Sequence, residues 1–123
     1  MAAANLQAAA AAAYTNLDTQ WVAGTLKTAL TTFWQSIDAT FPDQSPNNQP
    51  IGNWIALIAA VAYECPATPP FGVGNPKDQW TFFNTAAQYV YRICWLGDYL
   101  DGQGLISSAQ ATALLAAFNA CFP

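Results

Sequence analysis

The segment IGNWIALIAAVAYEC, residues 51–65, is apolar on nearly every face of a helix, with Asn53 and Glu64 as its polar exceptions. A helix that is apolar all round has to be enclosed by other elements, so the segment predicts a central helix with several neighbours. Its length of about 15 residues falls short of the roughly 20 that a bilayer-spanning helix needs. We therefore expect a packed bundle with residues 51–65 in its middle.

The residues before this segment carry a helical apolar pattern. Thr15 forms a capping-box pattern with Asp18, and apolar residues then recur at steps of three and four, which is the spacing of one helix face. The pattern predicts a helix that ends near Thr40, and Gly24 is expected to weaken this helix without breaking it. Its apolar positions are Tyr14, Leu17, Trp21, Val22, Leu26, Leu30, Phe33 and Ile37.

Two further helices are predicted in the second half of the chain. One starts at Asn75-Pro76, because Asn can cap a helix and Pro fits its first position. It carries two apolar stripes side by side. An apolar face of this width is typical of a helix that contacts two neighbours, or a neighbour and a partner. The other runs from about Ser108 to Cys121. The first stripe is Trp80, Phe83, Ala87, Val90 and Cys94, the second is Phe82, Ala86, Tyr89, Ile93 and Leu96, and the last helix turns Ala111, Leu114, Leu115, Phe118 and Phe122 inward.

Proline-rich stretches separate these helices, FPDQSPNNQP at 41–50 and PATPPFGVGNPKD at 66–78. The sequence has no strand pattern bounded by turn signals. We therefore predict an all-α fold, a compact bundle of four or five helices with two long Pro-rich connecting loops, in a single domain over residues 1–123. The Ala-rich residues 2–13 are expected to form a helix peripheral to this bundle.

Charged residues make up 8% of the chain, against about 25% in an average soluble protein. Lys27, Lys77 and Arg92 are too few and too dispersed to bind nucleic acid or an anionic membrane surface. No apolar run is long enough for membrane insertion, and the Ala-rich start lacks the basic residues of a signal peptide. These features predict a protein made in the cytoplasm, and an extracellular particle is a compatible destination.

The cysteines Cys65, Cys94 and Cys121 form no CxxC pair, and the sequence contains no histidine. A zinc site would need carboxylates from distant positions, so we expect no metal and no other cofactor. In an up-down-up arrangement Cys65 and Cys121 share one end of the bundle, which makes a disulfide between them sterically feasible, with Cys94 at the other end. Three buried free thiols that act as small apolar groups are the favoured alternative.

The stretch YLDGQGLISSAQ, residues 99–110, resembles a calcium-binding EF-hand loop. Aligning Gly104 with the glycine of such a loop places Asp101 on a ligand position. However, Tyr99 and Gln110 then occupy the first and last ligand positions, where the loop needs Asp and a bidentate Glu, so we expect no calcium binding. Glycines can end a helix, and Ser107 with Gln110 forms a capping box, so the stretch predicts a turn between two helices.

Few residues are candidates for catalysis. A Ser or Cys nucleophile usually relies on histidine, which the chain lacks. The one glutamate, Glu64, ends the most apolar helix, and an ion pair with Lys77 is favoured over a role as a buried acid. Asp98 and Asp101 are the other carboxylates that could serve an enzyme. We therefore predict a non-catalytic protein, with a carboxylate-based enzyme as the least favoured alternative.

The connection after Cys65 contains an apolar run without a helical period, and it is longer than bundles usually need. Such a loop lies over its own core or docks on a partner. The candidate interface consists of Pro69, Pro70, Phe71 and Val73.

The stretch WIALIAAVAYE, residues 54–64, resembles the core helix of head–tail connector proteins of tailed phages, where an apolar helix ends in Tyr-Glu. Like the charge deficit, this resemblance implies a structural protein. Our first hypothesis is a protein that packs into a larger oligomer or particle, by self-assembly or with other subunits, through apolar and neutral polar surfaces. A viral or phage virion component is one concrete form. The alternative is a helical module that binds a small apolar ligand among its aromatic residues.

Overall fold

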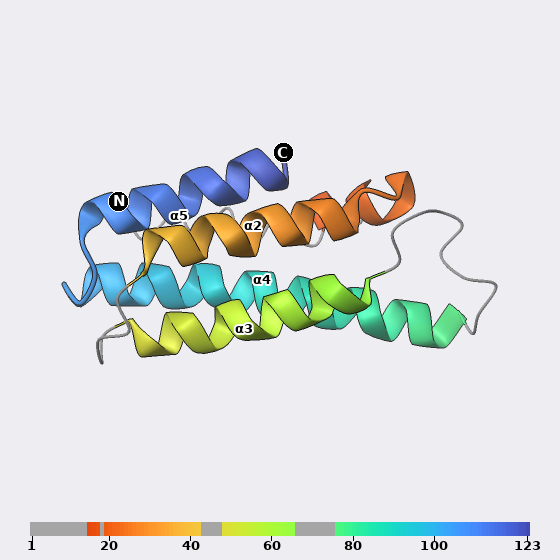
Figure 1. The fold of residues 1–123 in the computed structure, drawn as a ribbon, viewed down its shortest axis with the longest axis horizontal. Coiled ribbons are helices and arrows are strands. Elements are labelled where there is room, and N and C mark those ends of the chain that lie inside the picture. The colour runs from red at the N-terminus through yellow and green to blue at the C-terminus, as the bar shows by residue number, and fades with distance from the viewer. Residues whose placement is uncertain (1–14, 18, 43–47, 66–75) are drawn as a thin grey trace.

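The computed structural model describes residues 15–17, 19–42, 48–65 and 76–123, and for residues 76–83 the backbone alone. Its main helices are α2 (Leu26–Thr40), α3 (Gln49–Glu64), α4 (Pro76–Gly102) and α5 (Ser108–Cys121) (Figure 1). A shorter helical segment covers residues 15–17 and 19–23, and we call it the N-terminal segment. Helices and their connections account for all of the described backbone, so the predicted all-α bundle is confirmed.

Successive helices of the bundle run in opposite directions (Figure 1). α2 packs against α3 and α5, and α4 also packs against α3 and α5, so the four helices form a ring around one core. Each helix therefore turns one side inward and one side outward. No described helix is both long and apolar enough to cross a lipid bilayer.

The core is filled by side chains from all the helices. Phe33 of α2 meets the rings of Phe118 and Phe122 edge-on, with centroid distances of 6.4 and 5.3 Å. Aromatic pairs prefer this geometry, so the rings pack against one another and fill the space between α2 and α5. In α4 the described members of both predicted stripes are buried or partly buried: Ala86, Ala87, Tyr89, Val90, Ile93, Cys94 and Leu96.

α3 is not the central, fully enclosed helix that its composition predicts. Its inward side carries Ile51, Ile55 and Ile58, whereas Leu57 and Tyr63 on its other side are exposed. The reason is that four helices of similar size share one core, so α3 occupies a corner of the ring like the other three. Its outward side includes alanines, which tolerate exposure and made the segment look uniformly apolar.

The predicted continuous helix from Thr15 to Thr40 is wrong, because the chain breaks at Gly24. Gly24 has a φ of 80°, a conformation that glycine adopts at little cost. The N–H groups of Gly24 and Thr25 donate to Trp21 and Gln20 carbonyls at 3.2 and 3.0 Å, which closes the N-terminal segment with a Schellman motif. Val22 lies before the break in the N-terminal segment and, although predicted to face inward, is 72% exposed.

The same motif ends α4. Gly104 has a φ of 70°, and the N–H of Leu105 donates to the Leu100 carbonyl at 2.9 Å. The N–H of Gly104 donates to the Asp101 carbonyl at 3.0 Å, which completes the Schellman motif. The turn that was predicted between two helices within YLDGQGLISSAQ is therefore confirmed, after the end of α4 at Gly102 and before the start of α5 at Ser108.

α5 starts at the predicted capping box. The N–H of Gln110 donates to Ser107 Oγ, and the N–H of Ser107 donates to Gln110 Oε1, both at 3.0 Å. The Gln110 amide also donates to the Thr40 carbonyl at 3.4 Å, which ties the turn to the end of α2. The start of α5 is thus fixed mainly by residues close together in the sequence.

The N-terminal segment is attached to the far end of α5. The side-chain amide of Asn16 donates to the Phe122 carbonyl at 2.8 Å, and that of Gln20 donates to the Cys121 carbonyl at 3.1 Å. Leu17 between them is fully buried. These contacts join residues more than 100 positions apart and hold the segment against the C-terminal end of α5.

Candidate interaction surface

Three aromatic side chains form a line on the outward side of α4. Tyr91, Trp95 and Tyr99 are 38%, 47% and 49% exposed. Their spacing of four residues makes them neighbours along one ridge of the helix. The rings of Trp95 and Tyr99 stack almost in parallel, with centroids 5.7 Å apart and planes at 8°. We call these three residues the aromatic ridge.

The ridge faces outward because the opposite side of α4 packs into the core. Val90, Ile93 and Cys94 are fully buried. The three residues of the aromatic ridge follow one another at steps of four residues on the opposite, solvent-facing side of the helix. Exposed apolar groups that gather on one side of a helix, unlike single ones scattered over a surface, mark interaction sites.

A hollow of about 200 Å³ lies beside the ridge and is lined by Tyr91, Arg92 and Trp95. We call it the α4 hollow. Arg92 is exposed and is the one charged residue among the exposed side chains on the described part of α4. Tyr, Trp and Arg are the residue types that contribute most binding energy at protein interfaces. The ridge and the hollow together therefore have the composition of a protein contact site.

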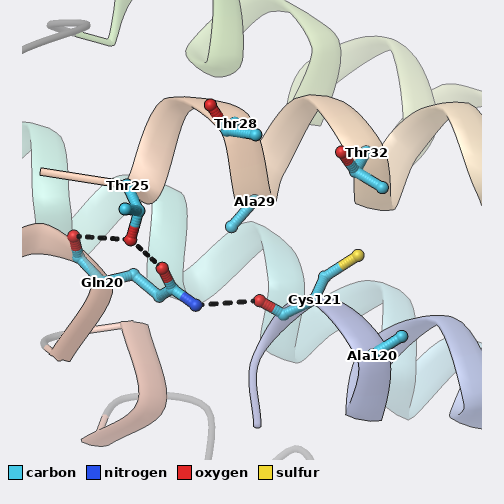
Figure 2. A pocket seen from close by; sticks show the side chains of 7 residues that line it. All are labelled: Gln20, Thr25, Thr28, Ala29, Thr32, Ala120 and Cys121. Atoms are coloured by element: carbon cyan, nitrogen blue, oxygen red, sulfur yellow. Dashed lines mark hydrogen bonds between the residues drawn. The ribbon is translucent and has the colours of Figure 1, made fainter.

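A second concave site, of about 300 Å³, lies between the N-terminal segment, α2 and α5 (Figure 2). Gln20 crosses it to reach the Cys121 carbonyl, and the Thr25 hydroxyl donates to the Gln20 side-chain oxygen. Its hydroxyl, amide and methyl groups are neutral. Such a lining offers hydrogen bonds but no activated nucleophile or acid–base pair. The full lining is Gln20, Thr25, Thr28, Ala29, Thr32, Ala120 and Cys121.

Lys27 closes the C-terminal end of α3. Its ammonium group donates to the carbonyls of Ala62, Tyr63 and Cys65 at 2.9, 2.8 and 3.2 Å. The same nitrogen lies 5.8 Å from the centre of the Tyr63 ring. A cation at a helix C-terminus satisfies carbonyls that have no partner in the helix and interacts favourably with the helix dipole.

The predicted pairing of Glu64 with Lys77 stays a prediction, because the Lys77 side chain lies outside the described residues. Glu64 itself is exposed at the end of α3. Asp98 is buried and Asp101 is partly buried on α4. Among the described side chains, no cluster of three or more His, Cys, Asp or Glu residues is arranged to hold a metal ion.

All three cysteines are buried free thiols. Cys65 follows α3 beside Lys27, and Cys121 ends α5, so both lie towards the end of the bundle where α2 begins. Burial raises the pKa of the Cys65 thiol to about 11, although the nearby Lys27 ammonium acts in the opposite direction. Burial also raises the pKa of Cys94, to about 12, and that of Cys121. Protonated thiols of this kind pack as small apolar groups and react poorly as nucleophiles.

The candidate interface at Pro69, Pro70, Phe71 and Val73 lies outside the described residues, as do residues 2–13. Sequence reasoning missed the aromatic ridge. The signal was present in the spacing of Tyr91, Trp95 and Tyr99, which lie beside the two apolar stripes rather than within them.

Comparison with known proteins gives no relative for this chain. No family model matches it, and neither does any curated protein or solved structure.

Proposed function

We propose that this chain is a non-catalytic structural protein that assembles with other protein subunits, and that the aromatic ridge is one of its contact surfaces. The observation that carries the proposal is the exposure of Tyr91, Trp95 and Tyr99 on one side of α4. A chain with 8% charged residues that also leaves three large rings in water has a surface suited to burial against protein.

The energetics favour burial of this surface. A fully buried Tyr or Trp side chain covers about 150–250 Å². The ridge residues still expose less than half of their surface, and covering this apolar area contributes roughly 25 cal/mol per Å². The opposing cost comes from charged and polar groups that lose water on contact. On the ridge and around the α4 hollow that cost is small, because Arg92 is the one charge there.

A virion component, viral or phage, is the concrete form of assembly that we propose. The scarcity of charge and the resemblance of residues 54–64 to a connector helix support it. Phe33, Phe118 and Phe122 pack against one another in the core, which supports a filled interior over a cavity for an apolar ligand. The loop residues from Pro69 to Val73 stay a second predicted contact.

The first test is the mass of the purified protein by size exclusion with light scattering over a concentration series. We expect the mass to rise with concentration in the wild type and to stay that of a monomer in Trp95→Asp. Val22→Asp is the matched control, because Val22 is also an exposed apolar residue but lies on the N-terminal segment. A wild type that stays monomeric, or a Trp95→Asp variant that still assembles, would contradict the proposal.

The loop is tested separately with Phe71→Asp. If the loop is a second contact, this variant should associate through the ridge but stop short of the larger assembly. Full assembly by Phe71→Asp would remove the loop from the proposal and leave the ridge as the contact surface.

A further inference from the structure

We infer that the partner of the aromatic ridge is a second copy of this chain, which places its own α4 antiparallel to the first around a two-fold axis near Trp95. The inference rests on the proposed function and specifies the partner and the geometry of the same surface. Three observations carry it: the order of residues along the ridge, the hollow beside it, and its charge.

The order of residues along the ridge, Tyr-Trp-Tyr at equal spacing, is the same from either end of the helix. Tyr91 and Tyr99 lie four residues before and four residues after Trp95. An antiparallel copy therefore presents Tyr99 opposite Tyr91, and Trp95 opposite Trp95. A two-fold contact requires this symmetry, because every contact occurs twice: Tyr91 of the first copy meets Tyr99 of the second, and Tyr99 of the first copy meets Tyr91 of the second.

The α4 hollow supplies the complementary shape. It is lined by Tyr91, Arg92 and Trp95, and it lies on the side of Trp95 where an antiparallel copy brings its Tyr99. Tyr99 is the most exposed ring of the ridge. Each copy thus inserts Tyr99 into the hollow of the other, where the guanidinium of Arg92 and the ring of Trp95 are suited to contact an aromatic face.

The charge of the surface permits this pairing. Two identical surfaces repel each other when they carry several charges of one sign, and this chain has a net charge of −4. Among the described side chains of α4 the acidic ones are Asp98, which is buried, and Asp101, which is partly buried, and none of the exposed ones is acidic. A second copy can therefore approach without bringing like carboxylates together.

The geometry also sets the strength of the contact. Residues four apart form an inclined row, and two such rows pack with the helix axes crossing at about 50°. The crossing confines contact to a few turns on either side of Trp95. Stable interfaces bury about 800 Å² per partner, more than three half-exposed rings supply, so we expect a weak dimer that dissociates on dilution. Such a contact becomes effective when others in an assembly reinforce it.

The test is a charge exchange between positions 92 and 99, followed by sedimentation equilibrium. Tyr99→Arg should weaken the dimer about thirtyfold, because it places a cation next to Arg92 of the other copy. The double variant Arg92→Glu with Tyr99→Arg should restore dissociation to within about threefold of wild type, because each Arg then meets a Glu across the two-fold axis. Both positions are exposed, so the changes leave the core intact.

The outcomes separate this inference from the proposed function. If Trp95→Asp abolishes association but the double variant stays as weak as Tyr99→Arg, the antiparallel pairing is wrong and the ridge still serves as an assembly surface. If association produces chains longer than a dimer that Tyr99→Arg does not weaken, the two-fold contact is also wrong. If the wild type is monomeric at every concentration, the inference and the proposed function fail together.

Discussion

The ends of α3 and α4 are closed in opposite ways. The end of α4 is closed by its own neighbours, because Gly104 and Leu105 return hydrogen bonds to carbonyls three and five residues earlier. The end of α3 depends on Lys27, which lies 35 to 38 residues earlier in the chain and comes from another helix. The comparison teaches that the end of α4 is determined by local sequence, whereas the end of α3 is stabilised only once α2 and α3 have packed together.

The largest expected effect comes from removing the long-range closure. Lys27→Met should lower the free energy of unfolding by about 2–3 kcal/mol, because hydrogen bonds from a charged donor contribute about 1.5–3 kcal/mol each and three carbonyls share this one. Urea unfolding measures the change. Gln35→Met on the exposed side of α2 is the control and should stay within about 0.5 kcal/mol of wild type. A Lys27 variant as stable as this control would show that water replaces the ammonium group without loss.

We expect the stability contributed by the end of α3, unlike that contributed by the end of α4, to decrease at alkaline pH. The pKa of the Cys65 thiol is about 11 in the folded chain and 9.0 in its ordinary state, so the unfolded chain loses this proton first as the pH rises. The stability that the buried thiol contributes is present below pH 9 and is lost between pH 9 and 11, by up to about 1.4 kcal/mol per pH unit.

Comparison with Cys65→Ala isolates this effect, because the other titrating groups are common to both proteins. The difference in unfolding free energy between wild type and Cys65→Ala should shrink as the pH rises above 9. Parallel curves for the two proteins would contradict the assignment. The Gly104→Ala variant, changed at the locally closed end, should follow the wild-type pH dependence.

A smaller effect tests the local closure. Gly104→Ala should destabilise the protein by about 1–2 kcal/mol, because a side chain is strained at its φ of 70°. Gly102→Ala, two residues away, should instead stabilise by about 0.5–1 kcal/mol, because that glycine is helical and a methyl group there meets no atom within 4 Å. Thermal unfolding of both variants measures the signs. Stability changes of the same sign in both variants would show that the positive φ of Gly104 does not determine its response to substitution.

The smallest effect is expected at the start of α5. Ser107→Ala should cost about 1 kcal/mol or less, because it removes one half of an exposed capping box. Hydrogen exchange of the Gln110 amide should quicken at the same time, since its acceptor is the Ser107 hydroxyl. Ser108→Ala, at the next exposed position, is the control and should leave that amide unchanged.

The sequence predicted the features that depend on neighbouring residues better than those that depend on the packing of distant helices. The bounds of α5, Ser108 to Cys121, were predictable because Gly104 and the Ser107–Gln110 capping box mark its start and the apolar pattern marks its extent. The start of α4 at Pro76 was predictable for a similar reason. The break at Gly24 was missed because the apolar spacing continues across it, and local periodicity outweighed a single glycine in the prediction.

The candidate surface was not predictable to the same degree. Lys27 reaches α3 only through the antiparallel packing of two helices, so no local pattern could identify its partners. For α4, Trp95 is as apolar as the buried residues around it, and the sequence contains two inward stripes beside the ridge. Which side faces water was decided by where α3 and α5 pack, a property of the ring of helices rather than of α4.

The hydrogen bond from Asn16 to the Phe122 carbonyl joins residues 106 positions apart, and this separation has a consequence for the order of folding. Closing so long a loop costs about 3 kcal/mol more conformational entropy than closing the short turn after α4. We therefore expect the α4–α5 hairpin to form early and the N-terminal segment to dock late. In the native protein this segment should accordingly open first, as the least stable cooperative unit of the bundle.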